Sequence, residues 1–361
     1  MYGLFKLLNI SYKKYMEEVG KIIFNLMTEN YKDNINDNKD LRDYLKEKTK
    51  DELMSTYALY NIAICDTNEI VELENYSKEE LIEKIMDFLD VQLVAILQFF
   101  EYDKMEEIRK LAEQDKVLNS ETNKNLKIPL FIINVLRKLN FVFCNRKGEH
   151  IEMHMPKFIR EKIKKIKNDV YLESYDEILL YTKGLVNAYG AIDFEEAYDI
   201  ISNDIRISYD RYYTLLSFVS AMELEPIVFS LNRIANYNLS EKQVDELMKI
   251  EKDIIIYDKK MYEMLGDSGY LNTIQEYNEL NRYLKEHYDI DLNEDEILRD
   301  ELVNNYIEVY QAEPNEAKQM IENVIEEYLE TDDIEKRKLI NKLDKIRKKM
   351  PVWAEGGKTT K

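Results

Sequence analysis

The sequence predicts a mainly α, multi-domain helical protein with small β-hairpin wings, and three observations lead to this class. Glycine and proline are scarce, at 9 and 5 of 361 residues, whereas sandwiches and barrels need many tight turns. Helix-opening motifs recur along the chain, and one stretch of strict apolar–polar alternation indicates a hairpin. Apolar residues make up 45% of the chain, which is enough for a sizeable core in two or three domains.

Helix starts are marked by capping boxes, in which Ser, Thr or Asp precedes Glu or Gln by three positions. These side chains satisfy backbone N–H groups that have no partner within the helix. Pro314 suits the first turn of a helix, and Gly190 suits a left-handed helix end. The boxes are Thr49/Glu52, Ser77/Glu80, Ser174/Glu177, Asp193/Glu196 and Ser240/Gln243, with Asn293/Glu296 as a close variant.

The pattern of helices and turns predicts a series of small segments. In the first winged-helix-like unit, helices at 91–100, 104–114 and 128–140 precede strands at 141–145 and 149–155 that flank a turn at 146–148. A second such unit has its helices at 175–190, 193–203 and 208–222. A generic helical repeat is the alternative for both units. The segments are an N-terminal helix (1–38), a two-helix module (39–90), the winged-helix-like units (91–168 and 174–238), a C-terminal helical domain (240–350) and a tail (351–361).

Residues 39–90 resemble the helix–extension–helix modules of the Rho termination factor N-terminal domain and the SAP domain. The matching elements are the capped "TKDEL" helix, the isolated Ile62 and then "SKEELIEKI". The resemblance covers about a seventh of the chain and implies a small nucleic-acid-associated module. The loop at 63–75 is longer than in those families and is acidic, so an ordinary helical hairpin is the alternative.

The rest of the chain resembles uncharacterised Firmicute or phage proteins with winged-helix-like units. "AYGAIDFEEAYDII" is similar to the first turn of many winged-helix proteins. The tail "MPVWAEGGKTTK" resembles the closing segment of such Firmicute proteins, some of which carry a Cys-rich zinc module that this chain lacks. This likeness implies lineage more than activity.

Charge is distributed unevenly in a chain of net charge −20. Residues 271–333 carry 19 Asp/Glu against 4 Lys/Arg, whereas residues 334–350 carry 2 against 8 and residues 157–167 carry 1 against 6. An acidic chain repels phosphate backbones, so nucleic-acid binding would have to use the local basic patches. Two cysteines cannot form a disulfide framework and favour a reducing cytoplasm, and no apolar run approaches the roughly 20 residues of a membrane span.

No motif predicts catalysis, a cofactor or a metal. The alternation from His150 to Met155 indicates a strand, on which His150 and His154 lie about 13 Å apart, too far to share zinc. Both histidines are therefore interpreted as solvated residues on an exposed strand face. "GDSG" (266–269) is expected to be a loop between helices, because the protease scaffold that uses this motif is missing.

Two further motif matches, to a phosphate-binding loop and to a calcium-binding loop, are rejected. "GKT" (357–359) lacks the glycine and the following helix of a phosphate-binding loop. The acidic stretch 289–300 has Glu294 where a calcium loop requires glycine, so we expect Asn293 to cap a helix instead.

The sequence therefore predicts a non-catalytic cytoplasmic regulatory protein that contacts nucleic acid or the transcription machinery through local basic patches. A wing tip suits phosphate contact, but the third helix is too apolar before Arg137 to read bases well. The alternative is an acidic protein–protein interaction adaptor that binds no nucleic acid, with the basic residues solvated or paired within the chain. The candidate nucleic-acid-binding residues are Arg137, Lys138, Arg146, Lys147, Lys157, Arg160, Lys164 and Lys165.

Overall fold

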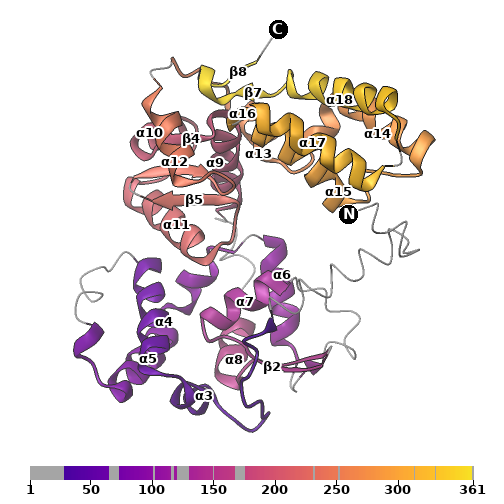
Figure 1. Ribbon diagram of the computed structural model, residues 1–361. Coiled ribbons are helices and arrows are strands. Elements are labelled where there is room, and N and C mark those ends of the chain that lie inside the picture. The colour runs from indigo at the N-terminus through magenta and orange to yellow at the C-terminus, as the bar shows by residue number, and fades with distance from the viewer. Residues whose placement is uncertain are drawn as a thin grey trace. The chain divides into compact units, whose positions relative to one another are not determined.

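Helices form most of the chain, as the computed structural model in Figure 1 shows, so the prediction of a mainly helical protein is confirmed. The described residues fall into two compact units. The first unit contains residues 28–177 and 207–225, and the second contains residues 178–206 and 226–359. The structure describes residues 28–359 except 65–72, 101, 115–117, 120–129, 149, 167–174, 231, 251–252, 313 and 330, and residues 1–27 of the predicted N-terminal helix lie outside this range.

The first unit opens with capped helices at the predicted positions. Thr49 and Ser77 form complete capping boxes at the starts of α4 and α5. The expectation of two helices meeting near residue 90 is wrong, because α5 runs unbroken through that position and no Gly or Pro interrupts it. The elements are α3 (Leu41–Glu47), α4 (Lys50–Ala63), α5 (Lys78–Leu97), α6 (Tyr102–Ala112), β1 (Leu118–Asn119), α7 (Leu130–Lys138), β2 (Phe143–Lys147), β3 (His150–His154), α8 (Lys157–Lys165) and α11 (Tyr209–Met222).

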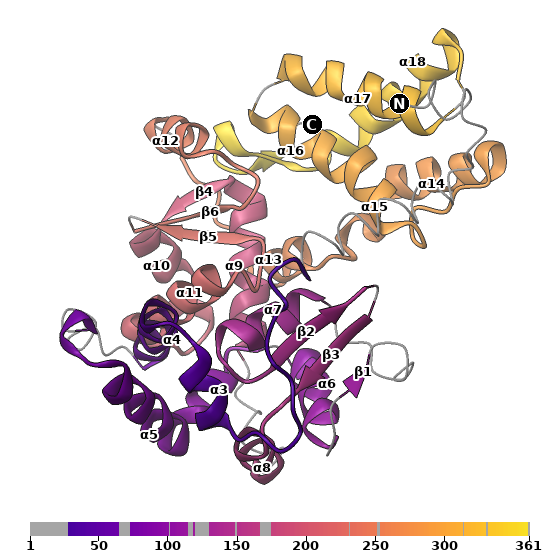
Figure 2. The same cartoon turned by 60° about the horizontal axis from the view of Figure 1, so that its bottom comes forward.

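A three-stranded antiparallel sheet in the order β1-β3-β2 lies beside these helices (Figure 2). The predicted hairpin is present, but its turn is tighter than expected. Arg146 and Lys147 belong to β2, with Lys147 opposite His150, so the chain reverses between these two residues. Gly148 has a φ of 67°, a left-handed conformation that glycine adopts without strain.

Residues 31–36 are extended rather than helical, and they line the outer edge of β2. The Arg146 N–H donates to the Tyr31 carbonyl at 2.9 Å, and the Asp33 N–H donates to the Cys144 carbonyl at 3.0 Å. A bridge between Lys32 and Asn145 completes this pairing. The edge of the sheet is therefore covered by a segment more than 100 residues away in sequence.

The second unit contains another three-stranded sheet and a helical region. The sheet order is β4-β6-β5, and Gly190 ends α9 with a φ of 73°, as predicted. The elements are α9 (Asp176–Tyr189, whose first residues belong to the first unit), β4 (Ala191–Asp193), α10 (Phe194–Asp204), β5 (Ile227–Ser230), β6 (Arg233–Asn236), α12 (Glu241–Lys249), α13 (Lys259–Gly266), η3 (Tyr270–Thr273), α14 (Gln275–Tyr288), α15 (Glu296–Arg299), η4 (Asp300–Asn304), α16 (Asn305–Ala312), α17 (Pro314–Tyr328), α18 (Asp333–Arg347), β7 (Pro351–Val352), η5 (Trp353–Glu355) and β8 (Lys358–Thr359).

Helices α9 and α13 approach each other closely at two glycines. A β-carbon on Gly184 would lie less than 3.0 Å from three backbone atoms of Tyr262. A β-carbon on Gly266 would meet the backbone of Leu180 in the same way. The "GDSG" stretch begins at this contact and continues as the loop between α13 and η3, as expected.

The C-terminal tail packs against the end of α9. Trp353 is buried, its Nε1–H donates to the Asn187 carbonyl at 3.0 Å, and its ring fills the space beside Gly190. Tyr189 also donates to the Ile255 carbonyl at 2.7 Å. The tail is thus part of the core of the second unit.

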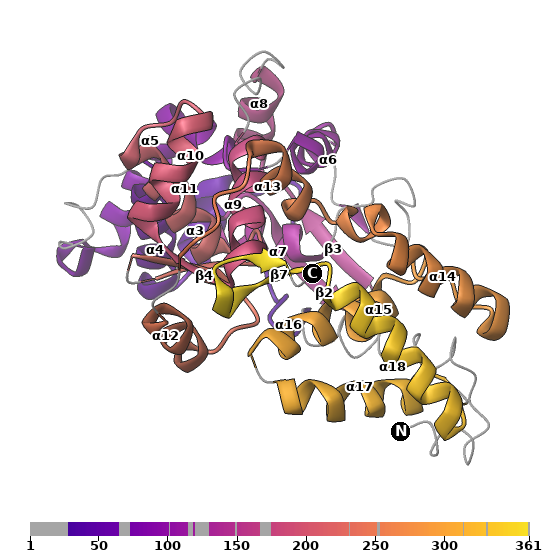
Figure 3. The same cartoon turned by 90° about the horizontal axis from the view of Figure 1, so that it is seen from above.

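Helices α14 to α18 share one apolar core, and Figure 3 shows α14, α17 and α18 from above. Two lysines of the basic segment 334–350 pair with this acidic region: Lys349 with Glu276 at 3.3 Å, and Lys336 with Glu326. The expected cap at Asn293 is wrong. Asp295 caps α15 instead, because its carboxylate accepts the Leu298 N–H at 3.0 Å.

Candidate nucleic-acid interface

Two of the eight predicted cations are held inside the first unit. The Arg137 guanidinium donates to the Asn30 carbonyl at 3.0 Å and lies 4.3 Å from the centre of the Tyr31 ring. Arg160 is 8% exposed, and its Nη1 donates to the Gln114 carbonyl at 2.8 Å. These guanidinium groups stabilise the fold and offer little surface to a ligand.

The other six cations lie nearer the surface, at separate places on the unit. Lys138 at the end of α7 pairs with Glu223 at 3.6 Å, and Lys147 at the hairpin tip pairs with Glu152 at 2.7 Å. Arg146 is half-buried, and its Nε–H donates to the Gly148 carbonyl at 2.8 Å. Helix α8 presents the remaining exposed lysines, at positions 157, 164 and 165. Strand β3 separates the hairpin tip from α8 by about 13 Å, so the eight residues do not form a single patch.

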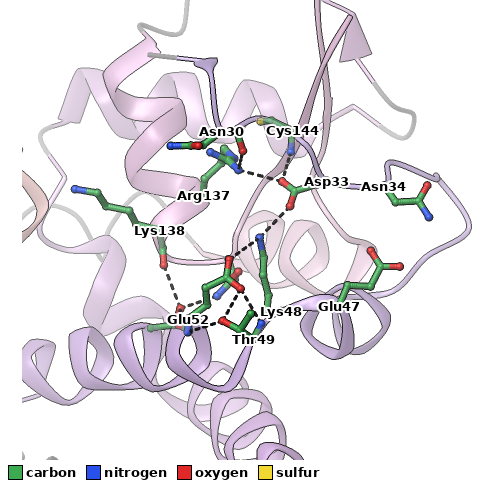
Figure 4. A network of polar contacts seen from close by, with 12 residues as sticks. Asn30, Asp33, Asn34, Glu47, Lys48, Thr49, Glu52, Arg137, Lys138 and Cys144 are labelled. Atoms are coloured by element: carbon green, nitrogen blue, oxygen red, sulfur yellow. Dashed lines mark hydrogen bonds and ion pairs between the residues drawn. The ribbon is translucent and has the colours of Figure 1, made fainter. Parts of the chain in front are cut away.

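An ion-pair network centred on Asp33 holds Arg137 in place (Figure 4). The Asp33 carboxylate accepts hydrogen bonds from the Cys144 N–H at 2.8 Å and from Lys48 at 2.9 Å, and Arg137 approaches it at 3.4 Å. Its side chain is 12% exposed. One carboxylate therefore links the extended segment 31–36, the α3–α4 junction, α7 and β2. Sequence reasoning missed it, because an isolated Asp carries no local pattern.

Helix α7 is buried along most of its length. Ile132, Ile133, Val135 and Leu136 are each at most 4% exposed. Asn134, which lies on the other side of the helix, accepts a hydrogen bond from the Tyr31 hydroxyl at 2.7 Å. The helix that occupies the recognition position in the sequence is thus largely buried on one side and hydrogen-bonded to residues 30–31 on the other.

His154 is buried, at 2% exposure, so the interpretation of two solvated histidines is wrong for this residue. Its Nδ1 lies 2.8 Å from the Tyr44 hydroxyl, which also contacts the Asn36 N–H at 3.1 Å and the Asn36 carbonyl at 3.0 Å. All three contacts are satisfied together if Nδ1 carries the proton and Tyr44 donates to the carbonyl. Nε2 is buried without a hydrogen-bond partner. The alternation pattern failed here because α3 covers the end of this strand face.

Burial, together with the nearby positive charge of Arg160, lowers the pKa of His154 to about 4. An unfolded histidine titrates near 6.5, so the folded state favours the neutral ring. The resulting stability is fully present above pH 6.5 and is lost as pH falls from about 6.5 to about 4. We expect His154 to account for about 3 kcal/mol of acid destabilisation across this window.

Urea unfolding of the wild type and His154→Asn at several pH values measures this contribution. Asparagine does not titrate there, so the variant should lose less stability than the wild type between pH 6.5 and pH 4. Parallel pH profiles for the two proteins would contradict the assignment. Replacing half-buried His150 in the same way serves as the control.

Helix α8 is the candidate element that sequence reasoning treated only as a basic run. Ile159 and Ile163 are buried one turn apart, and the three basic residues in the last turn complement the helix dipole. That apolar spacing is the pattern that would have identified the helix. The surrounding segment from Lys116 to Lys167 carries 13 Lys/Arg and 4 Asp/Glu, a net charge of +9 in a chain of −20.

Comparisons with protein-family models, curated proteins and solved structures find no match to this chain. The site is therefore interpreted from its own geometry.

The described residues contain no group of three or more His, Cys, Asp or Glu side chains arranged to hold a metal ion. In the same part of the chain, no helix has both the length and the apolar character that a bilayer crossing requires. Burial raises the pKa of the Cys144 thiol well above its ordinary value, so this buried cysteine is a poor nucleophile.

Proposed function

We propose that this chain is a non-catalytic regulatory protein that contacts nucleic acid through the basic segment 116–167. The main support is the exposed lysine face of α8, which belongs to a segment with a net charge of +9. Lys157 is 75% exposed, and Lys164 and Lys165 are exposed at the C-terminal end of the helix. A helix rise of 1.5 Å per residue puts Lys157 and Lys164 about 10 Å apart on one face, a span that meets several phosphates of a duplex.

The proposal includes a winged-helix-like arrangement for segments 91–168 and 174–238. Two features support it: a β-hairpin follows α7 in the first segment and α11 in the second, and each sheet has its first strand paired with the third. The capped helices α4 and α5 also support a helix–extension–helix module at 39–90, and a cytoplasmic location fits the reducing environment inferred from the cysteine content.

Neutralising the α8 lysines tests the function. In the variant Lys157→Gln/Lys164→Gln/Lys165→Gln, we expect affinity for a DNA duplex at low salt to fall about tenfold or more. The slope of log K against log salt concentration should fall by about 3, because each lysine accounts for about one phosphate contact. Fluorescence anisotropy over a salt series gives both values.

The matched control changes three exposed lysines of the second unit, Lys242, Lys249 and Lys260, to Gln. It produces the same change in net charge, and we expect affinity to change less than about twofold. Equal losses in both variants would show a general charge effect and refute the role of α8, and circular dichroism checks that both variants fold.

A second candidate function, an acidic protein–protein interaction adaptor, is favoured by the acidic region 271–333. Exposed carboxylates there include Glu316, Glu322 and Glu326 on α17. Such a surface attracts basic proteins through charge complementarity. Purification of the tagged chain with and without nuclease separates the two functions, because adaptor partners survive nuclease treatment and partners bridged by nucleic acid do not.

A further inference from the structure

Among the eight candidate cations of the first unit, the exposed ones are all lysines. Base edges in the major groove are read through paired hydrogen bonds from Arg or Lys to guanine and from Asn or Gln to adenine. Lysine carries a compact, strongly hydrated charge on a flexible stem, which suits phosphate contact at variable geometry.

Among the α7 residues whose burial is described, no Arg, Asn or Gln is exposed for base reading. At 100° per residue, its buried positions 132, 133, 135 and 136 cover about 160° of the helix surface. The remaining face contains Asn134 and Arg137, and both are bonded to the extended segment through Tyr31, Asn30 and Asp33. Lys138, at the last position of the helix, is the one exposed side chain among the α7 residues whose burial is described.

In helix α8 and in the hairpin, the arginine side chain is likewise hydrogen-bonded within the protein, whereas exposed lysines lie beside it. The exposed residues of α8 are lysines and Glu161, whereas its arginine, Arg160, is buried and donates to the Gln114 carbonyl. In the hairpin, the Arg146 guanidinium donates to the Gly148 carbonyl, and Lys147 is exposed. The three arginines of the candidate set are thus hydrogen-bonded within the fold, and the five lysines of the set are exposed.

We infer that the basic segment binds the phosphodiester backbone of nucleic acid without reading base sequence. The inference rests on the proposed function and specifies its ligand: the charge and spacing of phosphates, independent of base identity. The bound state is electrostatic, so its affinity falls steeply with salt.

Competition binding with the full chain tests the inference. Three duplexes of equal length, one A·T-rich, one G·C-rich and one of mixed sequence, are compared by anisotropy with a single strand and an abasic strand of the same length. We expect the three duplex affinities to agree within about threefold with equal salt slopes, whereas sequence readers discriminate by roughly a thousandfold or more. The abasic and normal single strands should also bind equally.

The outcomes separate the inference from the proposed function. A preference of tenfold or more for one duplex, or loss of binding to the abasic strand, overturns the inference and leaves nucleic-acid binding intact. No binding to any probe at low salt overturns both. Arg146→Lys is the matched variant: it keeps the charge and removes the planar group, so an unchanged affinity supports backbone binding and a selective loss for one sequence opposes it.

Discussion

Replacing Asp33 with Asn is expected to lower the free energy of unfolding by about 3 kcal/mol. The substitution removes the negative charge between Lys48 and Arg137 and leaves two largely buried cations without their shared partner. Each of these side chains is only 17% exposed, so water replaces little of the lost interaction. Urea denaturation followed by circular dichroism gives the change directly.

Asp87→Asn is the matched control for Asp33. Asp87 undergoes the same chemical change at an exposed position in the middle of α5. Surface substitutions of this kind usually alter stability by less than about 0.5 kcal/mol. If the Asp33 and Asp87 variants unfold at the same urea concentration, the network in Figure 4 contributes nothing to stability.

Gly184→Ala is expected to destabilise the second unit by about 3 kcal/mol. Alanine favours a helix over glycine by about 1 kcal/mol, but the added methyl group would overlap the Tyr262 backbone. A backbone cannot rotate away as a side chain can, so α9 and α13 must separate. Trp353 fluorescence reports this unfolding, because the only tryptophan of the chain donates to Asn187, one turn from Gly184.

Gly269→Ala separates this steric effect from a general effect of replacing glycine. A β-carbon there meets the flexible carboxylate of Asp267 at 2.9 Å, and the backbone φ is not positive. We expect a change below about 1 kcal/mol at this position. Comparable losses for the two alanine variants would show that α9 and α13 are not in close contact.

Local patterns predicted the elements of this fold well. Capping boxes at Thr49, Ser77 and Ser240 lie at real helix starts, and Pro314 opens α17. These features act over three or four residues, so their consequences are visible in the sequence. The hairpin was predicted for the same reason, because alternation and a glycine turn are also local.

Contacts between distant segments determine which residues of the candidate site are buried, and local patterns do not reveal them. The burial of His154 depends on Tyr44, 110 residues earlier, and the burial of Arg137 depends on Asp33, 104 residues earlier. A basic residue beside a predicted wing has the same local pattern whether a distant carboxylate holds it or solvent surrounds it. The sequence therefore identified the basic region and could not separate its structural arginines from its exposed lysines.

The extended segment 31–36 has a consequence for how this protein can be divided. Family resemblance places the first module boundary at residue 39, yet the strand that covers β2 lies before it. A fragment that begins at residue 39 exposes the β2 backbone to pairing with other chains and leaves Arg137 without its carboxylate. The smallest independent form of the first unit thus includes residues that carry no recognisable motif.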